Sequence, residues 1–171
     1  MYVCYYLTGY LGDRSDGNEI VSTGAAQTWF VAGTIPFMLA GGVHALATLL
    51  DAVRPTFFSP IERSVLPALE GTGIRFRELF PGGSGATPSM WRAWLGFNIS
   101  HGLGLFTFGL LCLIIGTYDF ALVEDVDPIR PLTIAVSAAY LVLSLRFWFY
   151  VPTITIGVGT ACFAVASALS L

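Results

Sequence analysis

The chain has 171 residues, of which 55% are hydrophobic and 11% are charged, and its eight basic residues, all Arg, are outnumbered by eleven acidic ones. Because a soluble domain carries about 25% charged residues, this composition excludes a soluble enzyme, a disordered chain and a basic nucleic-acid-binding protein. The mean hydropathy of +0.73 indicates a multi-pass membrane protein.

The N-terminal segment, residues 1–27, does not resemble a cleavable signal peptide. Such a peptide begins with basic residues and continues with an apolar run. Here an uncharged, aromatic-rich stretch comes first, and Asp13, Arg14, Asp16 and Glu19 follow it. We therefore expect residues 1–27 to form an extracytoplasmic or interfacial segment.

Gaps between charged residues predict four transmembrane helices. A membrane span needs ~20 mostly apolar residues. The charge-free stretches place the spans at about 28–50, 91–118, 131–150 and 153–171. Ser89 is a suitable N-cap for the second span, Pro131 suits the first turn of the third, and Pro152 suits a break before the fourth. The prediction is an all-α polytopic membrane protein, with residues 28–171 forming a compact bundle of four transmembrane helices.

The long connection, residues 51–90, predicts an interfacial loop helix. Ser59-Pro60-Ile61-Glu62 fits a capping box, and apolar residues follow at helical spacing up to Leu69. Pro67 is expected to bend or end this helix early. A second short stretch, Ile74–Phe80, interleaves two Arg with apolar residues. A helix lying on the headgroups explains this pattern, and a lid or partner-docking arm is the alternative.

The distribution of Arg predicts the orientation in the membrane. The connection 51–90 carries four Arg, whereas the loop before residue 131 is acidic. Since Arg and Lys favour cytoplasmic loops, we expect residues 51–90 in the cytoplasm and both termini outside it. The expected location is a bacterial inner membrane.

Polar residues at membrane depth are the candidate functional residues, because such groups are costly there. His44, Asn98, His101 and Arg146 are all expected in the cytoplasmic half of the spans, and Asn98 and His101 share one helix face. We expect His44, Asn98 and His101 to face the bundle interior. Each also has a purely structural interpretation: Arg146 can extend to the interface, and His44, Asn98, Ser100 and His101 can join helices by hydrogen bonds.

The sequence predicts no metal site and no cofactor. The three cysteines, Cys4, Cys112 and Cys162, show no CxxC spacing, and no Asp or Glu falls inside a span. Two histidines on neighbouring helices leave a haem or pigment bound through His44 or His101 as an alternative.

Small residues predict where the helices approach one another closely. They recur at helical spacing on three of the four spans, and the candidates for helix packing are Gly33, Gly41, Gly96, Gly104 and Gly157. Ser100 lies between Gly96 and Gly104 on the same face. Pro36 is expected to bend the first span.

The run from Met90 to Gly104 resembles a family of uncharacterised bacterial four-helix integral membrane proteins. These proteins carry a W-x-x-G-F-N-x-S-H-x-x-G signature on the second helix, from which this chain departs in having Trp94 one residue closer to Gly96. They carry a G-x-x-H-L-like element on the first helix, which here is Gly41–Leu46. The resemblance covers residues from about 28 to the end of the chain. It implies the four-span fold and no activity.

Three functions fit these observations. The first is a non-catalytic membrane protein, either an accessory subunit of a complex or an apolar-ligand binder, whose partners are membrane lipids and other subunits. The second is a membrane-embedded enzyme acting on a lipid, isoprenoid or quinone, with Asn98 and His101 orienting and protonating the substrate and Arg146 holding an anionic group. The third is a transporter or channel, which the lack of an internal repeat disfavours.

Overall fold

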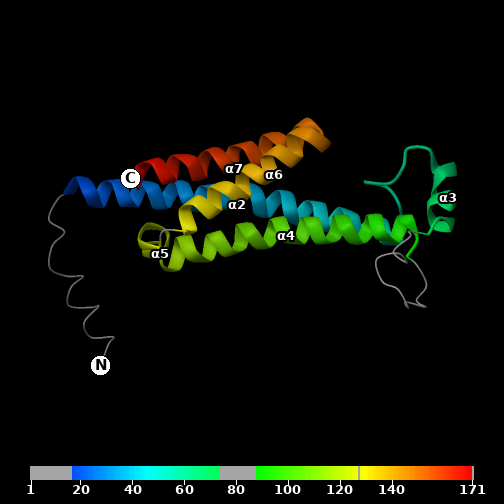
Figure 1. Ribbon diagram of the computed structural model, residues 1–171, viewed down its shortest axis with the longest axis horizontal. Coiled ribbons are helices and arrows are strands. Elements are labelled where there is room, and N and C mark those ends of the chain that lie inside the picture. Colours follow the sequence, from blue (N-terminus) through cyan, green and yellow to red (C-terminus); the bar gives the residue numbers. More distant parts are fainter. Residues whose placement is uncertain (1–16, 74–87, 127, 171) are drawn as a thin grey trace, which may run out of the picture. The chain divides into compact units, whose positions relative to one another are not determined.

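The computed structural model describes residues 17–73, 88–126 and 128–170 (Figure 1). Four long helices account for most of these residues: α2 (Gly17–Val53), α4 (Met90–Tyr118), α6 (Ile129–Phe147) and α7 (Tyr150–Leu169). In their described parts, the connections contain a 3-10 turn, η1 (Arg63–Val65), and two short helices, α3 (Leu66–Gly71) and α5 (Ala121–Asp125). Within the described ranges, β structure is limited to an isolated bridge between Gly73 and Ser89.

All four long helices contain a stretch that is long and apolar enough to cross a membrane. The predicted fold class, all-α with four spans, is therefore confirmed. The first helix is longer than predicted: α2 begins at Gly17 rather than near Thr28, and its 37 residues correspond to about 55 Å. Residues 17–27, which we assigned to a separate N-terminal segment, thus belong to this helix.

Local sequence signals explain most helix ends. The Ser89 hydroxyl accepts the backbone N–H of Arg92 at 3.3 Å, which confirms Ser89 as the N-cap of α4. Pro131 lies in the first turn of α6, as predicted. The break before α7 is at Trp148–Phe149, so Pro152 lies in the first turn of α7 and not in the break itself. Proline is tolerated there because the first turn leaves its N–H groups without helical partners.

The connection between α2 and α4 contains a helix, but it begins later than the capping box predicts. Residues 59–62 are not helical, and α3 starts at Leu66. Pro67 therefore opens this helix and does not end it, which its fixed φ angle favours. The stretch Ile74–Phe80 lies outside the described residues.

The chain divides into two compact units. Within the described residues, unit 1 covers 17–36, 109–126 and 128–170, and unit 2 covers 37–73 and 88–108. On α2 the division falls at Pro36, which lacks the N–H that would continue the helical hydrogen-bond ladder.

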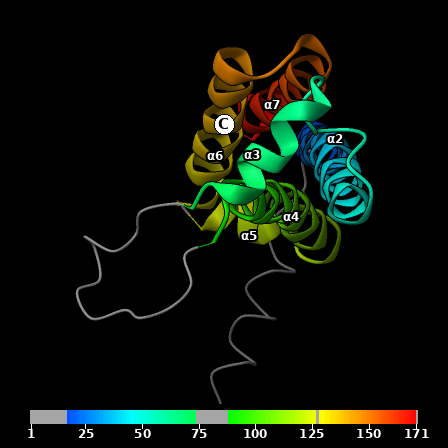
Figure 2. The same cartoon turned by 90° about the vertical axis from the view of Figure 1, so that its right-hand side faces the viewer.

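In unit 1, segments of all four long helices pack around aromatic side chains. Phe30 of α2 contacts Phe163 of α7 and Phe120, with ring centroids 5.2 and 5.7 Å apart. Gly33 faces the Phe163 ring, and α6 and α7 lie side by side in both cartoon views (Figures 1 and 2). Gly33 is thus at a helix contact, as predicted, and Gly157 of α7 faces Leu141 of α6.

In unit 2, α2 and α4 pack backbone against backbone. A Cβ atom built on Gly41 would lie 2.6 Å from the carbonyl oxygen of Gly102, and one built on Gly102 would lie 2.7 Å from the amide nitrogen of Ala45. Gly41 is therefore a packing residue, as predicted. Gly96 is not: a Cβ atom there would meet nothing within 4 Å, and Gly104 is also exposed. Gly102, one residue after His101, has the packing role on α4.

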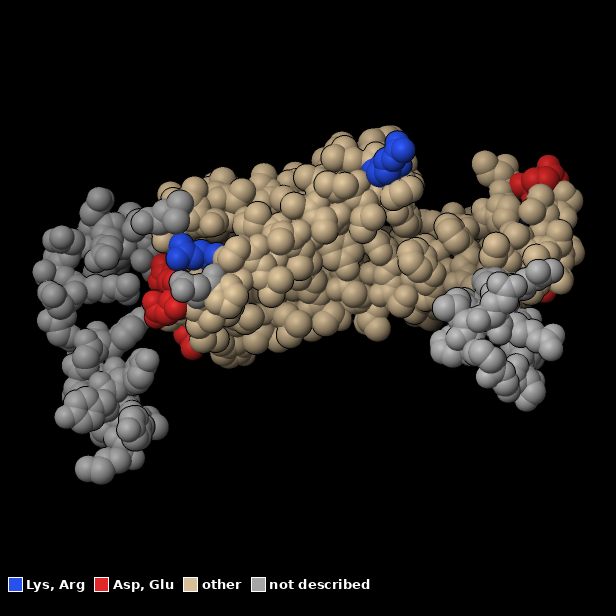
Figure 3. Space-filling view, viewed as in Figure 1, with Lys and Arg blue, Asp and Glu red and all other residues tan. Residues whose placement is uncertain are grey.

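Apolar side chains cover the outer surfaces of the long helices. On the face shown in Figure 3, the helical surface carries almost no charge, and the coloured Arg, Asp and Glu side chains lie near helix ends. Exposed side chains include Leu39, Val43 and Leu46 of α2, each at least 60% exposed. A surface of this kind suits contact with lipid chains.

Candidate functional site: a buried polar cluster and an aromatic cavity in unit 2

His44 and Asn98 join α2 to α4 through a buried hydrogen bond. Asn98 is 0% exposed, and its amide Nδ2 donates to the Trp94 carbonyl at 2.8 Å. Its Oδ1 therefore faces His44 Nε2, 3.1 Å away, and accepts the imidazole N–H. This pair uses both ends of the Asn98 amide, so the side chain has a single orientation.

His101 lies beside the His44–Asn98 pair. Its ring meets that of His44 edge to face, with 5.5 Å between centroids, and stacks on Phe97 one helical turn earlier. Asn98 and His44 are buried and His101 is half-buried. The structure therefore brings together these three residues, which the sequence predicts to face the bundle interior.

The contact between the two imidazoles bears on the haem alternative. Two histidines that share one iron must point a ring nitrogen at it from opposite sides of the macrocycle. Here the rings are in edge-to-face contact, so one imidazole turns its face toward the other, and a ring face does not ligate a metal. In this arrangement the two rings do not face a shared iron from opposite sides, and a haem or pigment bound through one histidine stays a prediction. Among the described residues there is also no group of three or more potential metal ligands.

Asp51 lies in the last turn of α2, the helix that carries His44. It is 0% exposed, and its carboxylate accepts three backbone N–H groups from the turn that follows the helix. Thr56 and Phe57 donate to Oδ1 at 2.7 Å each, and Phe58 donates to Oδ2 at 2.5 Å. A carboxylate at a helix C-terminus is otherwise unfavourable, because the helix dipole is negative there. These three donors compensate for its position.

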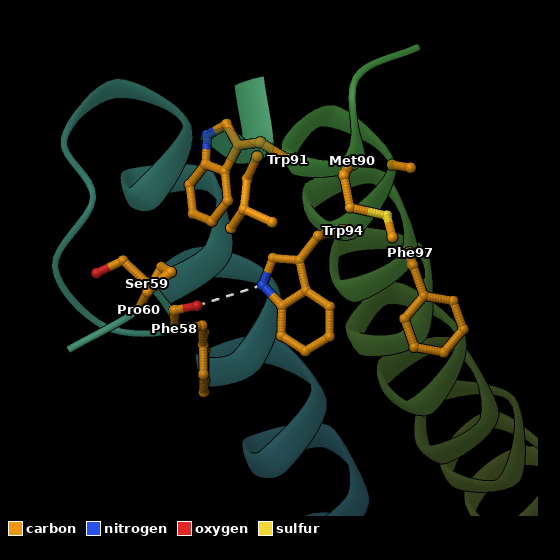
Figure 4. A pocket seen from close by; sticks show the side chains of 9 residues that line it. Phe58, Ser59, Pro60, Met90, Trp91, Trp94 and Phe97 are labelled. Carbon is orange, nitrogen blue, oxygen red and sulfur yellow. Dashed lines mark hydrogen bonds between the residues drawn. The ribbon is translucent and has the colours of Figure 1, made fainter. Parts of the chain in front are cut away.

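A cavity of about 530 Å³ adjoins this turn (Figure 4). It lies between the turn, α3 and the first two turns of α4, and aromatic and aliphatic side chains dominate its wall. The lining residues are Phe58, Ser59, Pro60, Leu69, Met90, Trp91, Ala93, Trp94 and Phe97. The volume is within the range of pockets that bind small molecules.

The cavity and the polar cluster share two aromatic side chains. Phe58 lines the cavity and also contacts His44, with ring centroids 4.7 Å apart. Phe97 lines the cavity and stacks on His101. The Trp94 indole N–H donates to the Phe58 carbonyl at 3.2 Å, which ties the turn to α4 (Figure 4). Each histidine is therefore one aromatic ring away from the cavity.

Ser100, another predicted site residue of unit 2, does not join this cluster. It is exposed, and its hydroxyl donates to the Phe97 carbonyl of its own helix at 2.9 Å. The predicted site residue Arg146 belongs to unit 1, where it is exposed in the last turn of α6. Within unit 2, the polar cluster therefore consists of His44, Asn98 and His101.

Sequence reasoning missed Phe58 and Trp91 as site residues, and it placed Asp51 on a polar stripe of the first span with His44 and Thr48 without making it a candidate site residue. An acidic residue in the last turn of a long apolar helix was a usable signal for Asp51, because that position demands compensating donors. The positions of Phe58 and Trp91 depend on how the turn folds back toward α4, and helical periodicity carries no information about that path.

Comparison with protein-family models, with curated proteins and with solved structures finds no match to this chain. The resemblance of residues 90–104 to a bacterial four-helix family therefore stays a prediction.

Proposed function

We propose that this small multi-pass membrane protein is a non-catalytic binder of an apolar, lipid-like ligand. The observation that carries the proposal is the cavity of about 530 Å³ lined by Phe, Trp, Met and Leu side chains. Such a wall favours an acyl chain or an apolar ring, because burying apolar surface contributes about 25 cal/mol per Å². Its few polar groups suit orienting a ligand rather than transforming it.

The same proposal includes the protein's setting. The Arg-rich connection 51–90 favours the cytoplasmic side for the cavity and an extracytoplasmic position for both termini. Bacterial inner membrane lipids are the proposed ligand source. Exposed apolar residues such as Val43, 67% exposed, leave a surface for lipid or for other subunits of a membrane complex.

Filling the cavity tests the proposal. Ala93 lines the cavity, so Ala93→Phe should occupy part of its volume. Leu103→Phe is the matched control, because Leu103 lies on the same helix, is 57% exposed and does not line the cavity. Native mass spectrometry of the detergent-purified protein should show a lipid-sized molecule retained by the wild type and by Leu103→Phe, and lost from Ala93→Phe. Equal retention by all three proteins, or no retention by the wild type, would refute the proposal.

A second candidate, a membrane-embedded enzyme acting on a lipid, isoprenoid or quinone, is favoured by the contact between His44 and His101. An imidazole pair beside a cavity can supply general acid and base groups. His101→Gln keeps a polar side chain of similar size while removing this chemistry. If the protein is an enzyme, the variant should retain its ligand and lose turnover of it. A ligand recovered chemically unchanged from both proteins would argue against catalysis.

A further inference from the structure

Asp51 is connected to the cavity through a short chain of contacts. Its carboxylate is 0% exposed and accepts N–H groups from three consecutive residues, ending at Phe58. Three donors in a row fix the backbone path of the turn, since charge-assisted hydrogen bonds are roughly twice as strong as neutral ones. These three hydrogen bonds therefore determine where Phe58 lies.

Phe58 connects the turn after α2 to α4, to His44 and to the cavity. Its carbonyl accepts the Trp94 indole N–H, its ring contacts His44, and the residue forms part of the cavity wall. Ser59 and Pro60, the next two residues along the chain, also line the cavity. The segment 58–60 thus supplies three of the nine lining residues, and Asp51 of α2 holds the turn 56–58 that leads into it.

We infer that Asp51 is the positioning residue of the ligand cavity: by holding the 56–58 turn, it sets Phe58 and Trp94 in the arrangement that shapes the wall. This inference rests on the proposed function for the ligand, but the position of Trp94 can be measured without one. Asp51 itself does not line the cavity, so its effect on binding passes through Phe58.

Asp51→Asn is the direct test. An amide oxygen can still accept from Thr56 and Phe57, but the amide NH2 opposes the Phe58 N–H. Thr48→Val is the matched control, because Thr48 is also 0% exposed on α2 and its hydroxyl donates only to the His44 carbonyl of its own helix. Thr56→Pro removes one backbone donor while leaving the carboxylate in place, and so it weakens the same set of hydrogen bonds on the donor side.

The first readout is the fluorescence of Trp94 in a protein whose other three tryptophans are replaced by Phe. Loss of the Asp51 hydrogen bonds should release the indole from the Phe58 carbonyl. The Trp94 emission should then shift to longer wavelength in Asp51→Asn and Thr56→Pro, but not in Thr48→Val. A protein retaining only Trp148, which belongs to unit 1, should show no shift with any of these changes. That comparison separates local release of the turn from general unfolding.

The second readout is the affinity for palmitate, used as the probe. Asp51→Asn should weaken binding about tenfold, the effect of losing one hydrogen bond to a charged group, while Thr48→Val should bind as the wild type does. If the wild type does not bind palmitate, the ligand proposal loses support, and the Trp94 emission still decides the role of Asp51. Unchanged Trp94 emission in both Asp51→Asn and Thr56→Pro would overturn the inference.

Discussion

At the scale of single residues, the Asn98 side chain is a fully buried polar group of unit 2 that hydrogen-bonds to both α2 and α4. Its amide accepts from His44 on α2 and donates to the Trp94 carbonyl on α4, and it is fully buried. A buried group that loses its partner costs more than the hydrogen bond itself contributes, because nothing replaces the missing contact. The Asn98 side chain therefore stabilises the position of His44 against α4.

Asn98→Ala should lower the free energy of unfolding by about 1–2 kcal/mol. The expected cause is the buried His44 N–H, which loses its acceptor. Ser100→Ala is the control two residues away, since Ser100 is exposed and its hydroxyl donates to its own helix. Unfolding in detergent, followed by circular dichroism, measures both variants. Equal stability of the two would contradict a structural role for the His44–Asn98 bond.

Helix periodicity predicted that His44, Asn98 and His101 face the bundle interior, and in the structure His44 contacts each of the other two residues. Their depth along each helix follows from the 1.5 Å rise per residue, and the three-residue spacing of Asn98 and His101 places them on one face. The sequence signals that Asp51 needs hydrogen-bond donors at the end of α2, but it does not show which groups supply them. These donors are three backbone N–H groups of a non-helical turn, and the position of Phe58 depends on the path of that turn.

At the scale of helices, the approach of α2 to α4 in unit 2 depends on glycine at two positions. Gly41 and Gly102 leave no room for a Cβ atom, because backbone atoms of the facing helix would lie within 2.4–2.7 Å of it. The sequence predicted Gly41 but placed the α4 contact on Gly96 and Gly104. Spacing alone cannot tell which of several small residues faces the neighbour, since glycines occur on more than one face of α4.

Gly102→Ala should force α2 and α4 apart and destabilise the protein by about 1–3 kcal/mol, the usual cost of overpacking a tight contact. Gly96→Ala offers a control on the same helix, because the added methyl group meets open space. Alanine favours helix over glycine by about 1 kcal/mol, so Gly96→Ala should be neutral or stabilising. Detergent unfolding measures both. Were the two variants equally stable, the close contact at Gly102 would be wrong.

At the scale of the whole chain, four candidate membrane spans predict that the two ends of the described chain lie on the same side of the membrane. The helices that could span are separated by connections of contrasting charge: the one from residue 54 to 89 contains four Arg, and the one from 119 to 128 contains four acidic residues and no basic one. Because basic residues favour the cytoplasm, the first connection and the cavity beside it should face the cytoplasm.

Alkaline phosphatase, which is active only outside the cytoplasm, measures this orientation when fused to the chain. A fusion after Leu171 should be active, and a fusion within residues 81–85 of the Arg-rich connection should be inactive. The prediction also has a charge-dependent form: replacing the four Arg of that connection with Gln should weaken the preference and yield a mixed population of fusions, because orientation follows the number of basic residues near the spans. Activity at the 81–85 fusion, together with inactivity after Leu171, would reverse the orientation and place the cavity on the extracytoplasmic side. The ligand would then have to come from the outer leaflet rather than from the cytoplasmic one.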